Sequence, residues 1–381
     1  DNIRVLRLGR LLTPATVLHM FDELPYDEKD ASAAARFKDR QSQTDGASPS
    51  EGGKSGSLTT LPAALRSRAI ELLARVPGVL SSYRLLIRLI ASVRLRRYQT
   101  TDIMLCPNFT PLSFRGKRIT TIGDLSTLRF PEHHPASRVV YVNKSIQRAI
   151  DESDHILTFS RLMKEDIVET YDVDADQVTV TYLGAHERFR FYPARELESL
   201  LERFGLRYKA YFFSNCTLEP RKNLERVLHA YQRYREQVGD EQALPLAMTG
   251  HHGWKNDALR ALMEPLVDSG HVRFLGYVSS DELARLIAGA RASVYLSLYE
   301  GFGLPVLEAL RCETLALTSA GTSMAEFATP QALLAEPTSV DSISQQLLAI
   351  HSRADSELRL RERAAPTATW AHCAQTTFQV M

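Results

Sequence analysis

From Thr101 onward, short apolar runs alternate with longer stretches in which apolar residues recur at helical spacing. The first series predicts strands at 103–106, 118–122, 155–159 and 178–183, with helices at 139–150 and 162–171 between them. After Gly184 a polar span rich in Arg and Glu leads to Lys209, where a second alternation begins and continues to about Ile350. Strands that alternate with helices are typical of parallel α/β structure. The pattern therefore predicts two Rossmann-like domains.

Local signals in the second series mark where helices begin. A Ser or Thr followed three residues later by an acid is the capping-box pattern. This pattern occurs at Ser279/Glu282, Ser323/Glu326 and Thr338/Asp341. Asn223 precedes a predicted helix that runs to about Val238, and Asn is a favoured N-cap residue. Each of these residues is expected to cap the helix that follows it.

The chain before residue 100 does not share the α/β pattern. Residues 36–62 are rich in Ser, Gly, Gln and charge, and are predicted to form a flexible surface insertion. The GGKSGS sequence at 52–57 lacks the glycine spacing of a phosphate-binding loop, and no predicted strand precedes it. Residues 63–99 are helical in pattern and strongly basic. They either lie on an anionic membrane surface or form a helix pair with solvated arginines.

The composition narrows the class of protein. The chain has 381 residues and 44% hydrophobic content, enough for more than one large core. Its formal net charge of +1 argues against a polyanion-binding protein, so no nucleic-acid partner is expected. The four cysteines show no metal-ligand spacing, which favours a reducing compartment. No apolar run reaches the roughly 18 residues that span a bilayer. We expect a cytoplasmic protein, with peripheral contact at the inner face of the membrane if residues 63–99 bind lipid.

The segment Tyr299–Leu310, read as YEGFGLPVLEAL, places two glutamates eight residues apart around a glycine turn. A predicted strand at 294–298 precedes it, and Pro305 suits the first position of a helix. The free amides at a helix start attract a phosphate or another anion. Glu300 could face a sugar, and Glu308 could accept hydrogen bonds from a ribose diol. The alternative is a helix start with two solvated acids.

A second segment has the same strand-to-helix layout. The apolar run at 211–214 is followed by the sequence NCTLEPRKN, in which Arg221 and Lys222 are adjacent cations. Arginine offers a forked set of donors and lysine a compact charge, and both suit a diphosphate. The alternative is two cations on a solvated helix start.

Together the two segments resemble the retaining nucleotide-sugar glycosyltransferases of family 4, the group 1 glycosyltransferases. The resemblance rests on EPRKN at 219–223, EGFGLPVLEA at 300–309, GHHGW at 250–254 and FLGYV at 274–278. It implies the GT-B fold, an α/β architecture in which two Rossmann-like domains face a central cleft. The implied divisions are an N-terminal acceptor-side domain at 1–184, a linker at 185–208, a nucleotide-sugar-binding domain at 209–366, and a C-terminal helix at 367–381 that crosses back onto the first domain.

The resemblance also implies roles for individual residues. A nucleotide diphosphate-sugar is the implied donor, with Arg221 and Lys222 on its phosphates, Glu300 near its sugar and Glu308 on its ribose. Arg221, Lys222 and Glu300 are accordingly the predicted catalytic residues. Further donor-binding positions are Gly301, Phe302, Gly303, Leu304 and Thr217, with Gly276 and Tyr277 in the base-side wall. Asp124 is the candidate on the acceptor side.

The implied reaction is transfer of a hexose with retention at the anomeric carbon. The acceptor is a glycan or a lipid-linked glycan in polysaccharide assembly, of which lipopolysaccharide is one case. Relatives often use GDP-mannose or a GDP-deoxysugar. Arg221 and Lys222 replace a metal in stabilising the leaving diphosphate, so no metal and no cofactor are expected.

Two other patterns carry groups that can bind metals. The run 171–176 contains Asp-x-Asp twice, which holds a divalent cation in a different glycosyltransferase fold, but acids between a helix and a strand also suit a turn. The pairs His133–His134 and His251–His252 would not point at one ion from a regular element. We expect these histidines to cap or line surfaces.

Three departures from the family pattern leave other functions open. Gly123-Asp124 stands where many relatives have His-Asp, residues 13–17 replace a loop that contains a glycine, and residues 313–315 replace Gly-x-Pro. A degenerate transferase that binds a nucleotide sugar or a partner without turnover is one alternative. A sugar-nucleotide epimerase of similar architecture is another, although it would need acid and base groups on both faces of the sugar.

Overall fold

The computed structural model describes residue 100 and residues 102–110, 114–251, 253–327, 332–354 and 368–381. Every helix and strand named below belongs to one compact unit, residues 99–111 and 115–381. The predicted insertion at 36–62, the basic stretch at 63–99 and the loop at 13–17 lie outside the described residues. Membrane contact through 63–99 therefore stays a prediction. Among the described helices, none combines the length and apolar character needed to cross a membrane.

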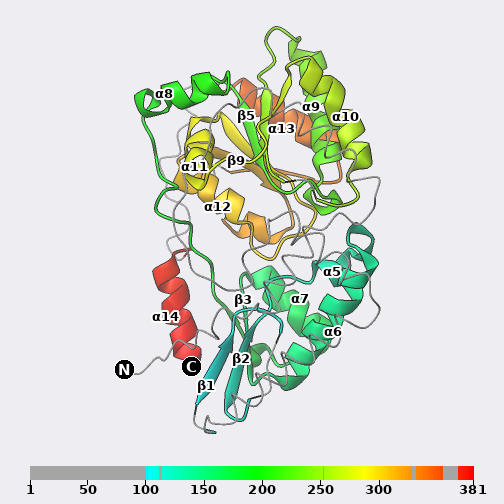
Figure 1. Cartoon of the computed structure of the whole chain (residues 1–381), viewed down its shortest axis with the longest axis vertical. Helices are drawn as coiled ribbons and strands as arrows, with labels where there is room; N and C mark the ends of the chain where they lie inside the picture. Colours follow the sequence, from blue (N-terminus) through cyan, green and yellow to red (C-terminus); the bar gives the residue numbers. More distant parts are fainter. Residues whose placement is uncertain (1–99, 101, 111–113, 252, 328–331, 355–367) are drawn as a thin grey trace, which may run out of the picture. The chain divides into compact units, whose positions relative to one another are not determined.

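The first sheet has four parallel strands in the order β1-β2-β3-β4 (Figure 1). Its strands are β1 (Ile103–Cys106), β2 (Lys117–Thr121), β3 (His155–Thr158) and β4 (Val178–Val180). Between them lie α5 (Ser126–Arg129), η1 (Pro131–His133), α6 (Ala136–Glu152), α7 (Arg161–Tyr171) and η2 (Ala175–Gln177). The predicted order of elements is confirmed. Strand β4 ends three residues before the predicted end, and Leu183 lies beyond it, where its side chain packs against the larger hydrophobic core.

The second sheet has six parallel strands in the order β10-β9-β8-β5-β6-β7. Its strands are β5 (Phe212–Asn215), β6 (Leu246–Thr249), β7 (Val272–Phe274), β8 (Ala292–Tyr295), β9 (Leu315–Ser319) and β10 (Leu333–Ala335). Numbered within this sheet, the order is the 3-2-1-4-5-6 arrangement of dinucleotide-binding folds. The strand order reverses between β5 and β8, and ligands in such sheets bind beyond the carboxyl ends of the strands at that point.

Helices cover both faces of the second sheet, and Figure 1 shows α9, α10 and α13 on one side with α11 and α12 on the other. The helical elements are α8 (Ala194–Arg203), η3 (Pro220–Lys222), α9 (Leu224–Val238), α10 (Asp257–Asp268), α11 (Ser280–Gly289), α12 (Leu304–Arg311), η4 (Ser323–Phe327), α13 (Val340–His351) and α14 (Trp370–Val380). A parallel sheet covered on both faces needs strands that are apolar throughout. Accordingly Tyr211, Phe212 and Phe213 are fully buried at β5.

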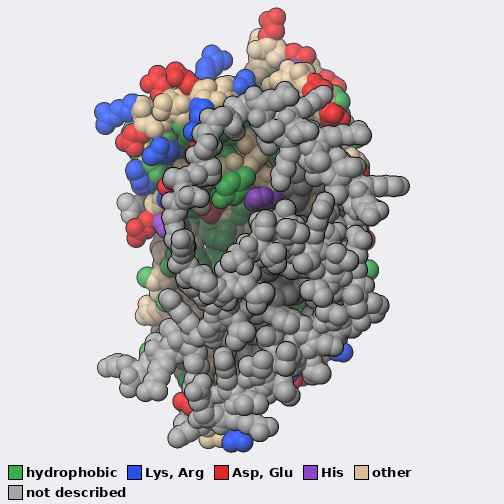
Figure 2. All heavy atoms as spheres, viewed as in Figure 1, with side chains coloured by type: hydrophobic (Ala, Val, Ile, Leu, Met, Phe, Trp, Pro, Cys, Tyr) green, Lys and Arg blue, Asp and Glu red, His purple; other side chains and the backbone are tan. Residues whose placement is uncertain are grey.

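Helix α8 shows how the surface is divided from this core. Leu197, Leu200 and Leu201 recur at helical spacing and are buried, while Glu198 and Ser199 between them are polar and exposed. Figure 2 shows acidic and basic side chains interspersed on the part of the surface where α8 lies in Figure 1.

One of the three predicted capping boxes is confirmed. At the start of α11, the Ser279 hydroxyl accepts from the Glu282 amide, and the Glu282 carboxylate accepts from the Ser279 amide at 2.8 Å. The other two are wrong. Ser339, not Thr338, caps α13 by accepting from the Ser342 amide at 3.1 Å.

Ser323 and Glu326 form long-range bonds in place of a cap. The Ser323 hydroxyl donates to the Glu300 carbonyl oxygen at 2.6 Å. The Glu326 carboxylate accepts from the amides of Arg161 and Leu162 at 3.0 and 2.8 Å, at the start of α7. These amides have no partner within their own helix, so a carboxylate from a distant segment satisfies them.

Asn223 precedes α9 as predicted, but its side chain does not cap the helix. The residue adopts a left-handed conformation with φ of 61°. Its side-chain amide donates to the carbonyl oxygens of Leu296 and Pro337 at 3.0 and 2.7 Å. Asn223 therefore ties the EPRKN turn to the segment that follows β8.

Helix α14 lies beside the first sheet, where the Lys117 ammonium donates to the Val380 carbonyl oxygen at 2.6 Å. The predicted domain boundaries near 184 and 209 stay predictions.

Candidate functional site

The two predicted motifs meet at the reversal point of the second sheet. The EPRKN turn follows β5 and the EGFGLP loop follows β8, and these strands are neighbours. A backbone bond joins the segments directly, since the Leu298 amide donates to the Arg221 carbonyl oxygen at 3.0 Å. The structure therefore places the basic pair and the glycine-opened helix side by side.

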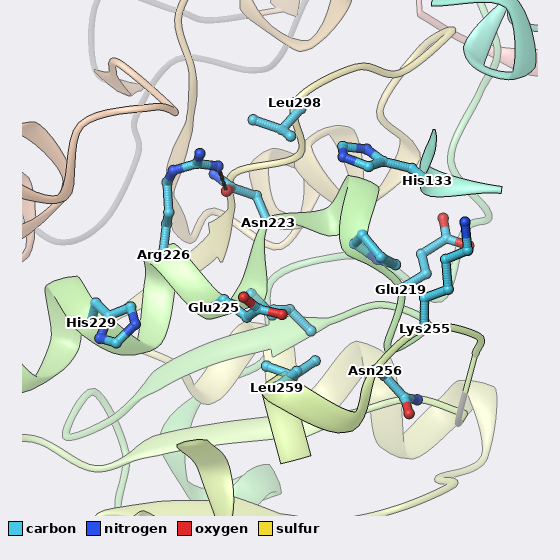
Figure 3. Close-up of a pocket in the computed structure, with 12 residues that line it drawn as sticks. His133, Glu219, Asn223, Glu225, Arg226, His229, Lys255, Asn256, Leu259 and Leu298 are labelled. Atoms are coloured by element: carbon cyan, nitrogen blue, oxygen red, sulfur yellow. Dashed lines mark hydrogen bonds between the residues drawn. The ribbon is translucent and has the colours of Figure 1, made fainter. Parts of the chain in front are cut away.

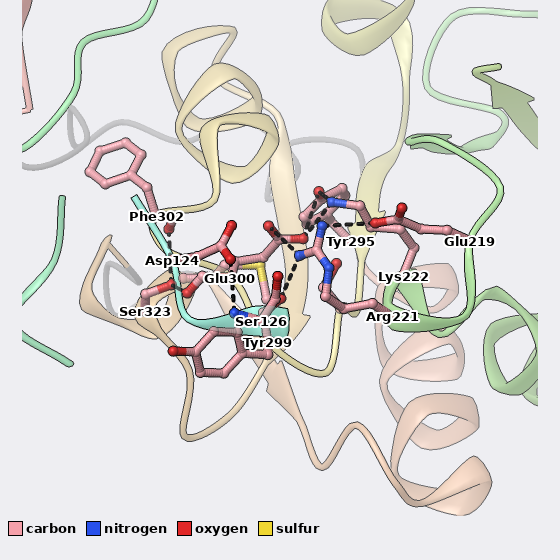
Figure 4. A network of polar contacts seen from close by, with 12 residues as sticks. Asp124, Ser126, Glu219, Arg221, Lys222, Tyr295, Tyr299, Glu300, Phe302 and Ser323 are labelled. Carbon is pink, nitrogen blue, oxygen red and sulfur yellow. Dashed lines mark hydrogen bonds and ion pairs between the residues drawn. The ribbon is translucent and has the colours of Figure 1, made fainter. Parts of the chain in front are cut away.

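Three predicted catalytic side chains form one ion-pair cluster, shown in Figure 4. The Lys222 ammonium donates to Glu300 Oε1 at 2.6 Å, and the Arg221 guanidinium lies 2.8 Å from Glu300 Oε2. Each of the three side chains is only 11–12% exposed. Glu300 thus holds both cations in the structure.

A second layer of contacts fixes the orientation of these groups. The Arg221 guanidinium also donates to Glu219 Oε1 at 2.8 Å and to the Tyr299 carbonyl oxygen at 2.7 Å. The Lys222 ammonium donates to the Tyr295 hydroxyl at 2.8 Å, and that hydroxyl donates to Glu300 Oε1 at 3.1 Å. Glu219 was not singled out by sequence reasoning. Its place in EPRKN was visible, but its role as a second anion for Arg221 depends on a side-chain contact.

Glu300 and Arg221 stabilise each other in their charged forms. Burial acts to raise the pKa of Glu300, but the charges of Arg221 and Lys222 outweigh it and lower that pKa to about 2. For Arg221, burial acts to lower the pKa, but the combined effects of Glu300, Glu219 and Asp124 leave that pKa raised. The two cations and two carboxylates balance in charge.

The loop before α12 requires glycine at two positions, one for its backbone conformation and one for a close contact. Gly303 is the N-cap residue with φ of 101°, in the left-handed region that favours glycine. A Cβ at Gly301 would overlap the carbonyl oxygen of Gly123 in the loop after β2. Within the described residues, the Gly301 and Gly303 amides donate to no backbone or side-chain acceptor, which leaves them available to an anion.

Glu308 lies one turn into α12, with Phe302 and Leu304 also placed in or beside the helix start. Among the described residues, its carboxylate forms no ion pair and no hydrogen bond, and its pKa is raised by burial to about 7. An acid held in this way is poorly solvated when ionised, and a ligand with hydroxyl donors would satisfy it.

The remaining predicted donor residues lie beyond the carboxyl ends of β5 and β7. Thr217 follows β5, while Gly276 and Tyr277 follow β7. The Gly276 carbonyl oxygen accepts from the Gly250 amide at 3.2 Å. The Tyr277 ring is 75% exposed and lies against the His251 ring with centroids 5.3 Å apart.

Asp124 lies in the loop after β2, where one carboxylate oxygen accepts from the Ser126 amide at 2.8 Å. It lines a cavity of about 200 Å³ together with His134, Arg138, Arg221 and Trp254. Sequence reasoning missed His134 as a site residue. The expectation that it would cap or line a surface is wrong, since it is only 3% exposed.

A larger cavity of about 370 Å³ lies on another side of the EPRKN turn (Figure 3). Arg226 and His229 of α9 face it from one side, and His133 and Lys255 from the other. Neither Lys222 nor Glu300 lines it. The ion pairs that Glu300 forms with Arg221 and Lys222 therefore lie outside this cavity, although Glu219 lines it.

The Asp-x-Asp run forms a turn. Asp172 ends α7 in a left-handed conformation, and the Asp174 carboxylate accepts from the Asp176 amide at 2.9 Å. Among the described residues, no group of three or more acidic, histidine or cysteine side chains could hold a metal ion. Whether the reaction needs a metal stays a prediction.

Comparisons with known proteins agree with this geometry. The family model for glycosyl transferases group 1 matches residues 206–366. The O-antigen chain mannosyltransferase B of Escherichia coli is 35% identical over 281 residues, which cover 74% of this chain and 73% of the relative.

Solved structures show the same fold at low sequence identity. WaaG, a glycosyltransferase involved in lipopolysaccharide biosynthesis, superposes with a TM-score of 0.58 at 15% identity, covering 81% of this chain and 80% of its own. Anabaena HepE in complex with UDP and glucose gives 0.54 at 15% identity, covering 70% and 71%. The chain has the GT-B fold and belongs to the group 1 glycosyl transferases.

Proposed function

We propose that the protein transfers a hexose, with mannose as the first candidate, from a nucleotide diphosphate-sugar to a glycan or lipid-linked acceptor in polysaccharide assembly. The observation that carries the proposal is the cluster of Arg221, Lys222 and Glu300 at the reversal point of the sheet, beside the glycine-opened start of α12. The name of the E. coli relative supports mannose and an O-antigen type of acceptor.

The chemistry follows from where charge develops. The bond between the anomeric carbon and the diphosphate oxygen breaks, and a bond to the acceptor oxygen forms on the same face. The acceptor proton passes to the departing diphosphate. Arg221, Lys222 and the amides before α12 stabilise the charge on that diphosphate more strongly in the transition state than in the ground state.

The pairing of Glu300 with both cations defines which contacts the donor has to change. The diphosphate would take over contacts of Arg221 and Lys222 that Glu300 holds in the structure. Glu300 would then face the sugar from its place in the loop between β8 and α12. Two side-chain cations supply the positive charge that a metal supplies elsewhere, so the proposed reaction needs no metal.

Glu308 and the loops after β5 and β7 would bind the nucleoside. A ribose diol would donate to the unpaired Glu308 carboxylate, and Thr217, Gly276 and Tyr277 would lie near the base. GDP is the proposed nucleotide. Because the structure of HepE contains UDP, the test includes both GDP-sugars and UDP-sugars.

The test is transfer of radiolabelled sugar from a panel of GDP-, UDP-, ADP- and TDP-sugars to mannose-terminated glycan acceptors. We expect transfer by the wild type, and a loss of about a hundredfold or more in Lys222→Ala and Glu300→Ala. Equal transfer by the wild type and both variants would overturn the proposed site.

Two other results would point to the alternatives. Binding of a nucleoside diphosphate without transfer to any acceptor would identify a degenerate transferase. Exchange of solvent protons into the sugar of the donor would identify an epimerase.

A further inference from the structure

The cavity of about 200 Å³ beside the ion-pair cluster contains one buried group that the proposed reaction does not use. The group is the imidazole of His134, which follows η1. His134 is only 3% exposed, and neither of its ring nitrogens has a hydrogen-bond partner among the described residues. A buried polar group without a partner typically costs about 1–3 kcal/mol, so most folds avoid one.

The surroundings hold His134 in place by its backbone and its ring face, while both ring nitrogens are buried without a hydrogen-bond partner among the described residues. The Trp254 indole donates to the His133 carbonyl oxygen at 2.6 Å, and the Lys255 ammonium donates to the His134 carbonyl oxygen at 3.1 Å. The Trp254 ring lies 5.9 Å from the imidazole, centroid to centroid. The loop that follows β6 therefore fixes the backbone on which this histidine stands.

The imidazole is uncharged at neutral pH. Burial, followed by the charges of Arg221 and Arg138, lowers the pKa of His134 to about 4, although Asp124 acts in the opposite direction. A neutral imidazole has one N–H donor and one bare nitrogen acceptor. It suits a partner that both donates and accepts, such as a hydroxyl group.

The charges that line the cavity argue for an uncharged ligand. Asp124 and the buried Glu219 carry negative charge, while Arg138 and Arg221 carry positive charge. The two signs balance, so this cavity does not attract a second phosphate. Trp254 adds an aromatic surface, and small-ligand sites typically combine such surfaces with a few placed polar groups.

We propose that this cavity is a monosaccharide subsite in which the His134 imidazole binds a hydroxyl group of a sugar ring. The proposal rests on the proposed transferase function and names a subsite and a residue within it. The cavity of about 200 Å³ is smaller than the roughly 300–1,000 Å³ of sites for drug-sized ligands, which suits one sugar unit. The sugar is either that of the donor or the terminal unit of the acceptor, since both present the same hydroxyl chemistry.

The test uses His134→Phe, which keeps a ring of similar shape without polar atoms, and His134→Gln, which keeps a donor and an acceptor. Because His134→Phe removes two unpaired nitrogens from a buried position, we expect its melting temperature to equal or exceed that of the wild type. We expect its KM for the sugar-bearing substrate to rise about tenfold, on the scale of one lost hydrogen bond with its desolvation cost, with partial recovery in His134→Gln.

Separate titrations identify the source of the sugar. If the donor supplies it, affinity for the GDP-sugar falls while affinity for GDP is unchanged. If the acceptor supplies it, both affinities are unchanged and the KM of the acceptor rises. His229→Phe in the larger cavity is the matched control and should alter neither quantity. Unchanged KM values for both substrates in His134→Phe would overturn the subsite.

A direct measurement separates this inference from the proposed function. Methyl α-mannoside at high concentration should raise the melting temperature of the wild type, and should raise that of His134→Phe much less. No shift in the wild type, or an equal shift in both, would overturn the subsite. Absence of transfer with the whole donor panel would instead overturn the transferase function.

Discussion

Lys222 Nζ lies 2.6 Å from Glu300 Oε1, so the cation proposed to bind the diphosphate is already paired with the carboxylate proposed to face the sugar. Arg221 contacts the other oxygen of the same carboxylate at 2.8 Å. Glu300 would thus compete with a diphosphate for the two cations. This relationship makes nucleotide binding and sugar transfer respond in opposite directions to a change at Glu300.

Glu300→Gln should tighten nucleoside diphosphate binding while it impairs transfer. Removing the negative charge frees Arg221 and Lys222 for the diphosphate, and we expect affinity for GDP or UDP to rise about tenfold, as measured by calorimetry. Sugar transfer should fall about a hundredfold. Glu225→Gln, an exposed acid of the larger cavity, should change neither quantity. Equal or weaker nucleotide binding by Glu300→Gln would show that the carboxylate does not compete.

Arg221→Ala should destabilise the fold more than an exposed arginine does. The change leaves the buried Glu219 without its ion-pair partner and Glu300 with Lys222 alone. Breaking a buried pair in this way typically costs about 3–5 kcal/mol in the free energy of unfolding. Arg233→Ala, which removes an exposed pair with Asp341, should cost about 1 kcal/mol or less. Denaturant unfolding of the two variants checks the difference, and similar losses would contradict a structural role for the cluster.

Glu308→Gln should change how stability depends on pH. Burial raises the pKa of Glu308 from an ordinary value of 4.5 to about 7. A carboxyl group shifted upward favours folding while it is protonated, so its contribution is complete below pH 4.5 and is lost as the pH rises through 7.

The amide of Glu308→Gln stays neutral at every pH. The free energy of unfolding of the variant should therefore rise relative to that of the wild type between pH 4.5 and 7, and the difference should reach roughly 3 kcal/mol above pH 7. Urea unfolding across this range measures the gain, with Glu241→Gln at an exposed position as the control. Parallel pH profiles for wild type and Glu308→Gln would show that Glu308 is well solvated.

Gly301→Ala should disrupt the site for steric reasons. The added Cβ at position 301 would overlap the Gly123 carbonyl oxygen, and a backbone atom cannot move away by changing rotamer as a side chain can. We expect loss of transfer and a lower melting temperature. Gly321→Ala is the control, because its Cβ would meet open space and the change adds only the strain of a left-handed residue, about 1 kcal/mol. A fully active Gly301→Ala enzyme would mean that the two loops do not approach each other as described.

The order of strands and helices and the meeting of the two motifs could be predicted from the sequence. Both motifs follow strands of one parallel sheet, and the carboxyl ends of such strands lie along one edge. Helix starts were less predictable. Ser279/Glu282 caps its own helix, whereas Ser323 and Glu326 bind segments far away in the sequence. The local pattern is the same in both cases, and only tertiary contacts decide between the outcomes.

The partners of charged and polar side chains also could not be predicted from the sequence. Arg221 and Lys222 could be assigned to a diphosphate from residue type and position, but their pairing with Glu219 and Glu300 depends on side-chain geometry. His134 was expected at a surface because two adjacent histidines on a regular element would not point at one ion. Its burial results from packing against Trp254, more than a hundred residues away, which no local pattern indicates.

Gly301 and Gly123 approach each other closely, but the contact restricts the side chain at position 301 more than the side chain at position 123. Gly301 is restricted by a carbonyl oxygen, which every amino acid carries, so no replacement of Gly123 would make room for a side chain at 301. A Cβ at Gly123 would meet only the edge of the Phe159 ring, at 3.1 Å. Position 123 can therefore accept a side chain if Phe159 shifts slightly, whereas position 301 is restricted to glycine.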